Sequence, residues 1–163
     1  MIEFKNLEKV LQQYANDVQT LYKENLIKDN AKASGELIDT VQYILETNKG
    51  SYIVNLRLAD YWKYVEYGRR AGAKFPPFDK IKNWIRIKPI LPRPLSNGKL
   101  PTLNQLTYLI SRKIAIDGIA PRNILSKTVE EINNEYDDKI SEAITIDIAE
   151  DLDKILIILE KTI

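Results

Sequence analysis

The sequence of 163 residues contains neither cysteine nor histidine. Without thiolates and imidazoles, the chain cannot form disulfides, zinc sites built on those groups, thiol nucleophiles or imidazole general bases. Glycine is also scarce, with six residues and no glycine-rich phosphate-binding loop. Carboxylates, lysine, serine or a magnesium ion could still support catalysis, but the commonest general base is missing. We therefore expect a protein that is not an enzyme and that carries no catalytic, cofactor or metal site.

Long hydrophobic runs are absent as well. No apolar stretch approaches the roughly 20 residues that a membrane span requires. The first residues, MIEFKNLEKVLQ, lack the basic start and the unbroken apolar segment of a signal peptide. We therefore expect no membrane association and a location in a reducing cytosol. Hydrophobic residues make up 44% of the chain and charged residues 29%, values typical of a folded globular protein.

Charge is distributed unevenly, although the net charge is only +1. Residues 69–99 carry nine basic side chains and one acidic one, whereas residues 128–163 carry eleven acidic and three basic side chains. Opposite charge on two parts of one chain predicts pairing, either within a subunit or between subunits. The alternative is that the basic stretch contacts the phosphates of a nucleic acid.

Apolar spacing predicts the first secondary-structure elements. Leu7, Leu11, Tyr14, Val18 and Leu21 recur at steps of four and three, which indicates an amphipathic helix over about residues 3–31. The segments 38–47 and 51–58 are rich in β-branched and aromatic residues and are separated by Asn-Lys-Gly, which predicts a β-hairpin.

Helices are expected over most of the remaining chain. Asp60 and Asp79 could each cap a short helix, and Thr102 a longer one that ends at Gly118. Between them, residues 89–101 hold four of the seven prolines and form a loop, which could be a disordered insertion or an arm that orders against a neighbour. Residues 123–161 continue as one helix or two.

These elements predict an α+β fold in which the long N-terminal helix and the C-terminal helices pack on a small antiparallel sheet. The hairpin, near residues 38–58, is expected under the first helix and the helix 102–117. We expect one α+β domain over residues 1–122, with the acidic helical segment 123–163 as part of the same domain.

Four short motifs follow one another along the chain. A Gly-Xaa-Leu step begins at Gly35, and the segment 61–68 reads YWKYVEYG. An Ile-x-x-Trp-Ile-x-x-Lys helix is centred on Trp84, and an Ile-x-x-x-Gly-x-x-Pro step runs over residues 114–121. The residues singled out in these motifs are Gly35, Tyr61, Tyr64, Glu66, Gly68, Trp84, Gly118 and Pro121.

The order and spacing of these motifs resemble those of the tail-completion, or head–tail joining, proteins of tailed bacteriophages, over about residues 5–140. The chain departs from the family pattern at Arg69, where a small residue is common, and at Asn123-Ile124, where a Pro-Phe pair is frequent. The resemblance implies a structural virion protein, assembled in the bacterial cytoplasm, that forms a homo-oligomeric ring at the neck. Such a ring would surround the DNA channel and contact neighbouring neck, connector or tail proteins.

A ring built from head-to-tail contacts needs two different, complementary patches on each subunit. The uneven charge suggests these patches: Arg69, Arg70, Lys74 and Arg93 on one side, and Glu131, Glu135 and Asp138 on the other. The alternative function is a small nucleic-acid-binding or regulatory module that uses the basic stretch 69–99. Glu66 could be a catalytic carboxylate, but beside several cations it reads better as a polar anchor in a turn.

Overall fold

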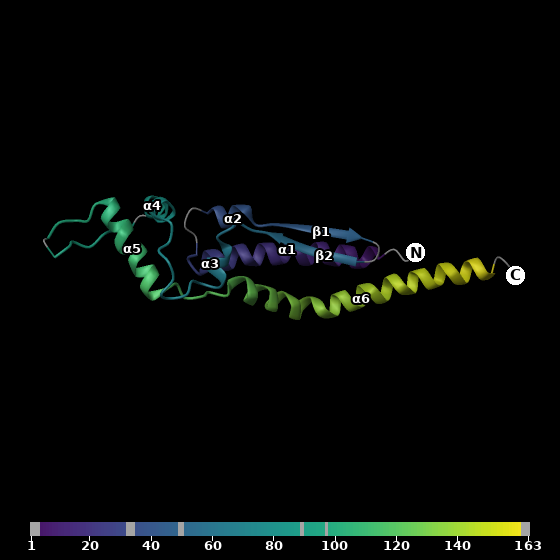
Figure 1. Ribbon diagram of the computed structural model, residues 1–163. Coiled ribbons are helices and arrows are strands. Elements are labelled where there is room, and N and C mark those ends of the chain that lie inside the picture. Colours follow the sequence, from purple (N-terminus) through teal and green to yellow (C-terminus); the bar gives the residue numbers. More distant parts are fainter. Residues whose placement is uncertain (1–3, 32–34, 49–50, 89, 97, 161–163) are drawn as a thin grey trace. The chain divides into compact units, whose positions relative to one another are not determined.

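The computed structural model describes residues 4–31, 35–48, 51–88, 90–96 and 98–160. Its class is α+β, as predicted, with a two-stranded antiparallel sheet and helices on both sides of it in the sequence (Figure 1). The elements are α1 Lys5–Lys28, α2 Glu36–Thr40, β1 Gln42–Asn48, β2 Ser51–Arg57, α3 Trp62–Glu66, α4 Phe78–Ile87, α5 Leu103–Asp117 and α6 Ile124–Glu160. The C-terminal segment is therefore one long helix.

The chain divides into two compact units. The first contains the described parts of Met1–Asn25, Val41–Leu58 and Leu125–Ile163, and therefore most of α1, the hairpin and α6. The second contains the described parts of Leu26–Thr40 and Ala59–Ile124, and therefore α2 to α5. We expected α5 to cover the hairpin, but α5 belongs to the second unit, and the helices that share a unit with the hairpin are α1 and α6.

The core of the first unit lies where α1, α6 and β2 meet. Val18 of α1 packs against Ile132 and Tyr136 of α6, and Leu56 of β2 contacts the same cluster. The ring of Tyr136 lies edge-on to that of Tyr14, with centroids 5.4 Å apart. Its buried hydroxyl donates a hydrogen bond to the carboxylate of Asp17. Burial and this bond raise the pKa of Tyr136 well above its usual value, so the phenol stays protonated as a donor.

The hairpin has the predicted pairing over part of its expected length. Asn48 pairs with Ser51 and Gln42 with Arg57; the intervening residues 49 and 50 lie outside the described part of the chain. The expected strand at 38–47 was wrong at its start, because residues 38–40 belong to α2. There the Thr40 hydroxyl donates to the Glu36 carbonyl at 2.7 Å, a helical contact that an extended strand would lack.

The second unit is built around the packing of α4 on α5. Ile85 is buried on α4, and the buried positions of α5 are the small residues Thr107, Ser111 and Ala115, spaced by four. Small side chains on one helical face allow a neighbouring backbone to approach closely. Trp84 and Leu106, two large apolar side chains on these helices, are only partly buried. Their replacement by alanine should therefore cost less than the ~2–5 kcal/mol typical of a fully buried side chain.

The helix ends show which capping predictions were right. Thr102 caps α5: its hydroxyl accepts from the Gln105 backbone N–H at 3.3 Å, and the Gln105 side chain accepts from the Thr102 N–H at 2.9 Å. The caps expected from Asp60 and Asp79 were wrong. The residue before α3 is Tyr61, whose backbone is already helical after a turn at Ala59, and α4 begins after Pro77.

Replacing Thr102 with alanine should lower the free energy of unfolding by about 1 kcal/mol, because the first turn of α5 loses its cap. Chemical denaturation measures the change. Thr145→Ala, the same substitution at an exposed position inside α6, is the control and should be neutral or slightly stabilising, since alanine has the higher helix propensity. Equal losses in both variants would contradict the cap.

Candidate partner-binding surfaces

Two motifs that are about fifty residues apart in the sequence lie side by side in the second unit. The backbone of Arg69 exchanges two hydrogen bonds with that of Ile119, each 2.8 Å long. Just beyond, the N–H of Gly72 donates to the carbonyl of Ala115 at 2.8 Å. We call this contact between residues 68–72 and 115–119 the glycine crossing, because Gly68 and Gly118 flank its paired residues.

Both glycines are required by this geometry. Gly68 and Gly118 have φ angles of +67° and +76°, which side-chain-bearing residues rarely adopt. A Cβ atom on Gly68 would lie 2.1 Å from the carbonyl oxygen of Ile119, and one on Gly118 would lie 2.3 Å from that of Arg69. The two backbones therefore approach more closely than any residue other than glycine permits.

The segment after the crossing is held to the end of α3. The backbone carbonyl of Glu66 accepts from the N–H groups of Arg122 and Asn123, at 3.2 and 3.1 Å. The Glu66 side chain is buried, while Pro121 is exposed. The structure thus brings together Glu66, Gly68, Gly118 and Pro121, which the sequence singled out in two separate motifs.

The remaining motif residues lie elsewhere in the same unit. Gly35 precedes α2 with a φ of +89°, and the hydroxyl of Tyr61 accepts from the Leu37 N–H at 2.8 Å, which ties α2 to α3. Tyr64 is exposed on α3, and Trp84 is partly buried on α4.

The predicted basic residues differ in how accessible they are. Arg70, Lys74 and Arg93 are exposed. Arg69 is half-buried; its guanidinium donates to the backbone carbonyl of Lys74, and its Nε atom is shielded from solvent. Arg69 therefore stabilises the loop that it begins. The cations available to a partner are Arg70, Lys74 and Arg93.

The predicted acidic residues form one exposed face of α6. Glu131, Glu135 and Asp138 are exposed and follow one another at steps of four and three, so they lie on the same side of the helix. Glu135 forms an ion pair of 2.7 Å with Lys139, whose ammonium lies 4.3 Å from the centre of the Tyr136 ring. This face is acidic and open to solvent.

An aromatic patch was not predicted as a site. The centroid of the Phe75 ring lies 6.1 Å from that of Phe78 and 6.1 Å from that of Tyr108, and each of the three residues is about half-exposed. Tyr108 comes from α5, thirty residues after Phe78, so no local sequence pattern joins it to the other two. Exposed aromatic side chains of this kind are enriched at protein interfaces.

Two other kinds of site were considered. Over the part of the chain that the structure describes, acidic residues do not gather in a group that could hold a metal ion. In that same part, none of the helices combines the length and the hydrophobicity needed to cross a bilayer.

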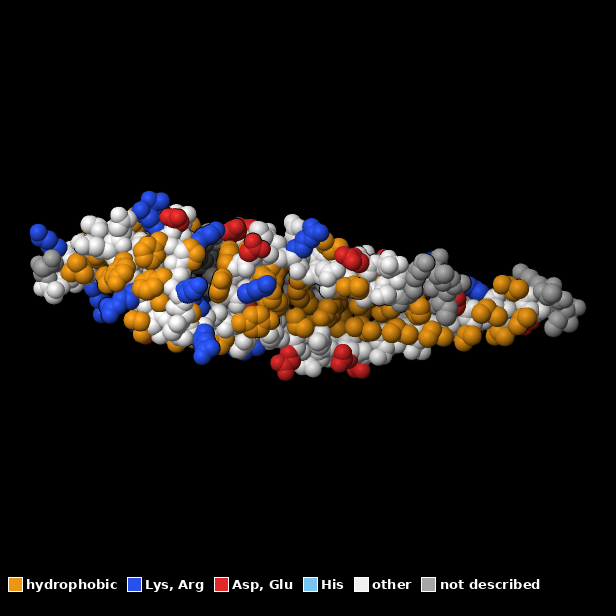
Figure 2. All heavy atoms as spheres, viewed as in Figure 1, with side chains coloured by type: hydrophobic (Ala, Val, Ile, Leu, Met, Phe, Trp, Pro, Cys, Tyr) orange, Lys and Arg blue, Asp and Glu red, His pale blue; other side chains and the backbone are white. Residues whose placement is uncertain are grey.

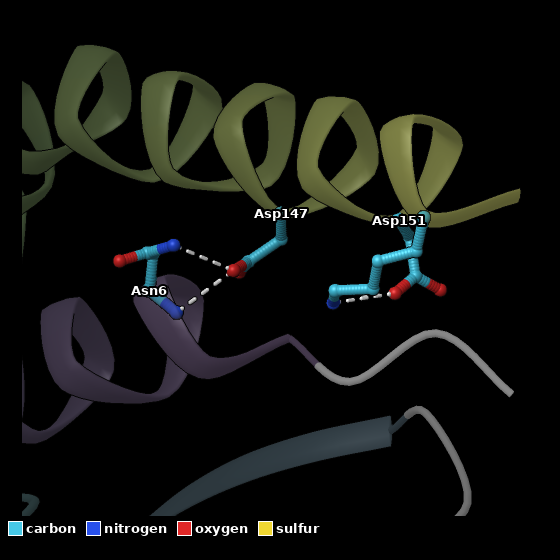
Figure 3. Close-up of polar contacts among 4 residues, drawn as sticks. Asn6, Asp147 and Asp151 are labelled. Carbon is cyan, nitrogen blue, oxygen red and sulfur yellow. Dashed lines mark hydrogen bonds and ion pairs between the residues drawn. The ribbon is translucent and has the colours of Figure 1, made fainter. Parts of the chain in front are cut away.

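A buried carboxylate in the first unit accepts hydrogen bonds from the start of α1. The carboxylate of Asp147, on α6, accepts hydrogen bonds from the backbone N–H and side-chain amide of Asn6, at 3.0 and 2.8 Å (Figure 3). It also accepts one from the N–H of Leu7 at 2.9 Å. Burial opposes ionisation of this carboxyl, but these bonds, with Lys154, hold the pKa of Asp147 below its usual value. Asp147 thus caps the first turn of α1 from another helix.

Comparison with known proteins gives no relative from which a function could be transferred. No family model, no curated protein and no solved structure matches this chain.

Proposed function

We propose that this chain is a structural virion protein that forms a ring at the neck of a tailed bacteriophage, where it completes the tail or joins it to the head. The observation that supports the proposal most is the glycine crossing. Two motifs of the family resemblance, at Glu66–Gly68 and Gly118–Pro121, pack on each other in a geometry that only glycine allows. If both motifs belong to the family's fold, we expect them to contact each other in this way.

The exposed patches suit an assembling subunit. The basic residues Arg70, Lys74 and Arg93 and the acidic face of α6 are both accessible, as head-to-tail contact between identical subunits requires. Each exposed ion pair contributes only ~0.2–1 kcal/mol, so the charges set orientation while apolar contacts supply most of the affinity. The aromatic patch and Leu91, which is 92% exposed in the proline-rich loop, are available for that purpose.

Charge reversal tests this arrangement. The pair Arg70→Glu and Lys74→Glu should weaken self-association by about tenfold or more, and adding Glu131→Lys and Glu135→Lys to the same chain should restore part of it. Sedimentation velocity over a range of protein concentrations measures the change.

A double reversal outside both patches, Lys9→Glu with Lys28→Glu, two exposed positions on α1, is the control and should leave association unchanged. If the fourfold variant associates no better than the first pair, the two charged patches do not meet between subunits.

The alternative function, a small nucleic-acid-binding or regulatory module, uses the same exposed cations. Such a protein would bind DNA or RNA as a small species, with an affinity that falls steeply as salt rises. The neck protein instead sediments with virions in a lysate of the phage that encodes it, and its absence leaves heads and tails unjoined. Strong nucleic-acid binding without virion association would favour the alternative.

A further inference from the structure

The C-terminal part of α6 extends past the helix on which the rest of it packs. Asp147 bonds to the first turn of α1, which begins at Lys5, so the thirteen residues from 148 to 160 lie beyond the start of α1. At 1.5 Å per residue this extension is about 20 Å long. We call residues 148–160 the α6 tail; Figure 3 shows the helix continuing beyond Asp147.

The α6 tail exposes a dense set of apolar side chains. Seven of its residues are large aliphatic side chains that are 39–63% exposed: Ile148, Leu152, Ile155, Leu156, Ile157, Ile158 and Leu159. Hydrophobic side chains run along this part of α6 on the face drawn in Figure 2, up to the residues drawn in grey. The last five are consecutive, so they surround the helix. A helix that is hydrophobic on all sides is normally enclosed.

The spacing of these side chains indicates what encloses them. Ile148, Leu152, Ile155 and Leu159 follow one another at steps of four, three and four, the a and d positions of a coiled coil. Leucine occupies the a positions, 152 and 159, and isoleucine the d positions, 148 and 155. Leucine at a with isoleucine at d favours bundles of three or four parallel helices over pairs.

The positions that flank the a and d residues also favour a bundle of more than two helices. Leu156 and Ile158 occupy the e and g positions, which hold charged residues in ordinary two-stranded coils. Apolar side chains on both flanks give each helix a surface for a neighbour on either side. Glu150, Asp153 and Lys154 fall at the outward f, b and c positions, and the charge of Asp151, at the g position of the first heptad, is paired with Lys154 at 3.0 Å. The pattern fits a closed set of like helices.

We infer that the α6 tails of three or more copies of this chain pack side by side as a parallel helical bundle. The parallel orientation of the helices rests on the proposed ring, because the tails of all subunits in a closed ring run in the same direction. Two heptads alone are too short to associate firmly. Here each tail continues a helix that is already folded, and the ring would hold the copies at high effective concentration.

A membrane surface is the other occupant to consider, and the charge pattern disfavours it. Helices that lie on membranes carry lysine and arginine on their polar face. The described tail carries Glu150, Asp151, Asp153 and Glu160 against Lys154 alone, so anionic lipids would repel it.

Two substitutions with matched chemistry test the bundle. Ile155 is 51% exposed at a d position, and Ile157 is 50% exposed at the outward f position. Both changes to glutamate should leave the monomer folded, because neither side chain belongs to the core. Ile155→Glu should raise the concentration needed for half-association by about tenfold or more, since each copy loses a buried aliphatic side chain. Ile157→Glu should leave it within about twofold of the wild type, since an f position stays in solvent.

The possible results distinguish the bundle from the proposed ring and from binding to a membrane. Equal effects of Ile155→Glu and Ile157→Glu, or no effect of either on an oligomer that still forms, would overturn the bundle and leave the proposed ring standing. A wild-type chain that stays monomeric would overturn both. Binding of the wild-type chain to phosphatidylcholine–phosphatidylglycerol vesicles, lost equally in both variants, would show that the tail is covered by lipid.

The direction of the helices has its own test. The chain contains no cysteine, so Leu159→Cys introduces a single thiol at an a position near the end of the tail. In a parallel bundle these thiols are adjacent, and mild oxidation of the oligomer should produce disulfide-linked dimers. Oxidation that leaves the oligomer free of linked chains would contradict the parallel arrangement.

Discussion

Replacing Gly118 with alanine should lower the free energy of unfolding by about 3 kcal/mol or more. Part of this loss, ~1–3 kcal/mol, comes from forcing a residue with a side chain into a backbone conformation, φ +76° and ψ −162°, that is essentially restricted to glycine. A further ~1–3 kcal/mol comes from overpacking, because the new Cβ would lie 2.3 Å from the carbonyl oxygen of Arg69 and 2.8 Å from the nitrogen of Ala71. The Arg69 oxygen cannot move without breaking its hydrogen bond to the Ile119 N–H. Gly68→Ala should have a comparable effect through Ile119.

Gly72→Ala separates the two causes. Gly72 has nearly the same φ, +75°, but a Cβ there would meet nothing within 4 Å. This control should therefore lose only the ~1–2 kcal/mol that the backbone conformation costs. Chemical denaturation of the three variants gives the comparison. Losses in Gly68→Ala and Gly118→Ala no greater than in Gly72→Ala would mean that the backbones do not approach as closely as described.

The second large effect is expected at Asp147. Asp147→Ala should lower the free energy of unfolding by about 3 kcal/mol, because it removes a charged acceptor of three hydrogen bonds and uncovers the N–H groups of Asn6 and Leu7. Asp147→Asn keeps the shape of the side chain and should lose less. Asp153→Ala, at an exposed position of the same helix, should change stability by no more than about 0.5 kcal/mol. A loss in Asp147→Ala no larger than in Asp153→Ala would contradict the interhelical cap.

The effect of Asp147 should depend on pH in a defined direction. Its pKa is lower in the folded protein than in the unfolded chain, so its contribution is present above the unfolded value of about 3.9. The contribution is lost as pH falls through the folded pKa. The difference in unfolding free energy between the wild type and Asp147→Asn should therefore be constant near neutrality and narrow below about pH 4. A difference that grows on acidification would contradict this assignment.

Much of the local structure could be predicted from the sequence, because local rules determine it. The apolar period of residues 7–21 predicted the helix α1, and Thr102, read as an N-cap, predicted the start of α5. The hairpin followed from two β-rich segments around a short turn. In each case, residues close in the chain decide the backbone conformation.

Features that depend on distant residues could not be predicted in the same way. Asp60 and Asp79 have the side chains of capping residues, but neither stands immediately before its helix. The residue before α3 is Tyr61, and α4 already begins at Phe78. The buried positions of α5 proved to be its small residues, which carry no strong hydrophobic signal. Asp147 was read only as part of an acidic segment, since nothing near it in the sequence reveals that the start of α1 lies beside it.

For the site residues too, the sequence predicted what nearby residues determine and not what distant residues determine. The glycines at 68 and 118 were recognised separately, but their contact is a property of the fold. Arg69 was grouped with the exposed cations, and its bond to the Lys74 carbonyl became visible only in the structure. The aromatic patch joins α5 to residues near α4 and so has no local signature.

The mass of the wild-type protein in solution tests the central claim, that this chain works by assembling with copies of itself, most directly. Native mass spectrometry across rising protein concentration should show one defined closed oligomer of three or more subunits of 18.8 kDa. Electron microscopy of the same sample should show a ring with a central opening. A chain that stays at 18.8 kDa at every concentration, or that forms aggregates without a defined mass, would contradict the account.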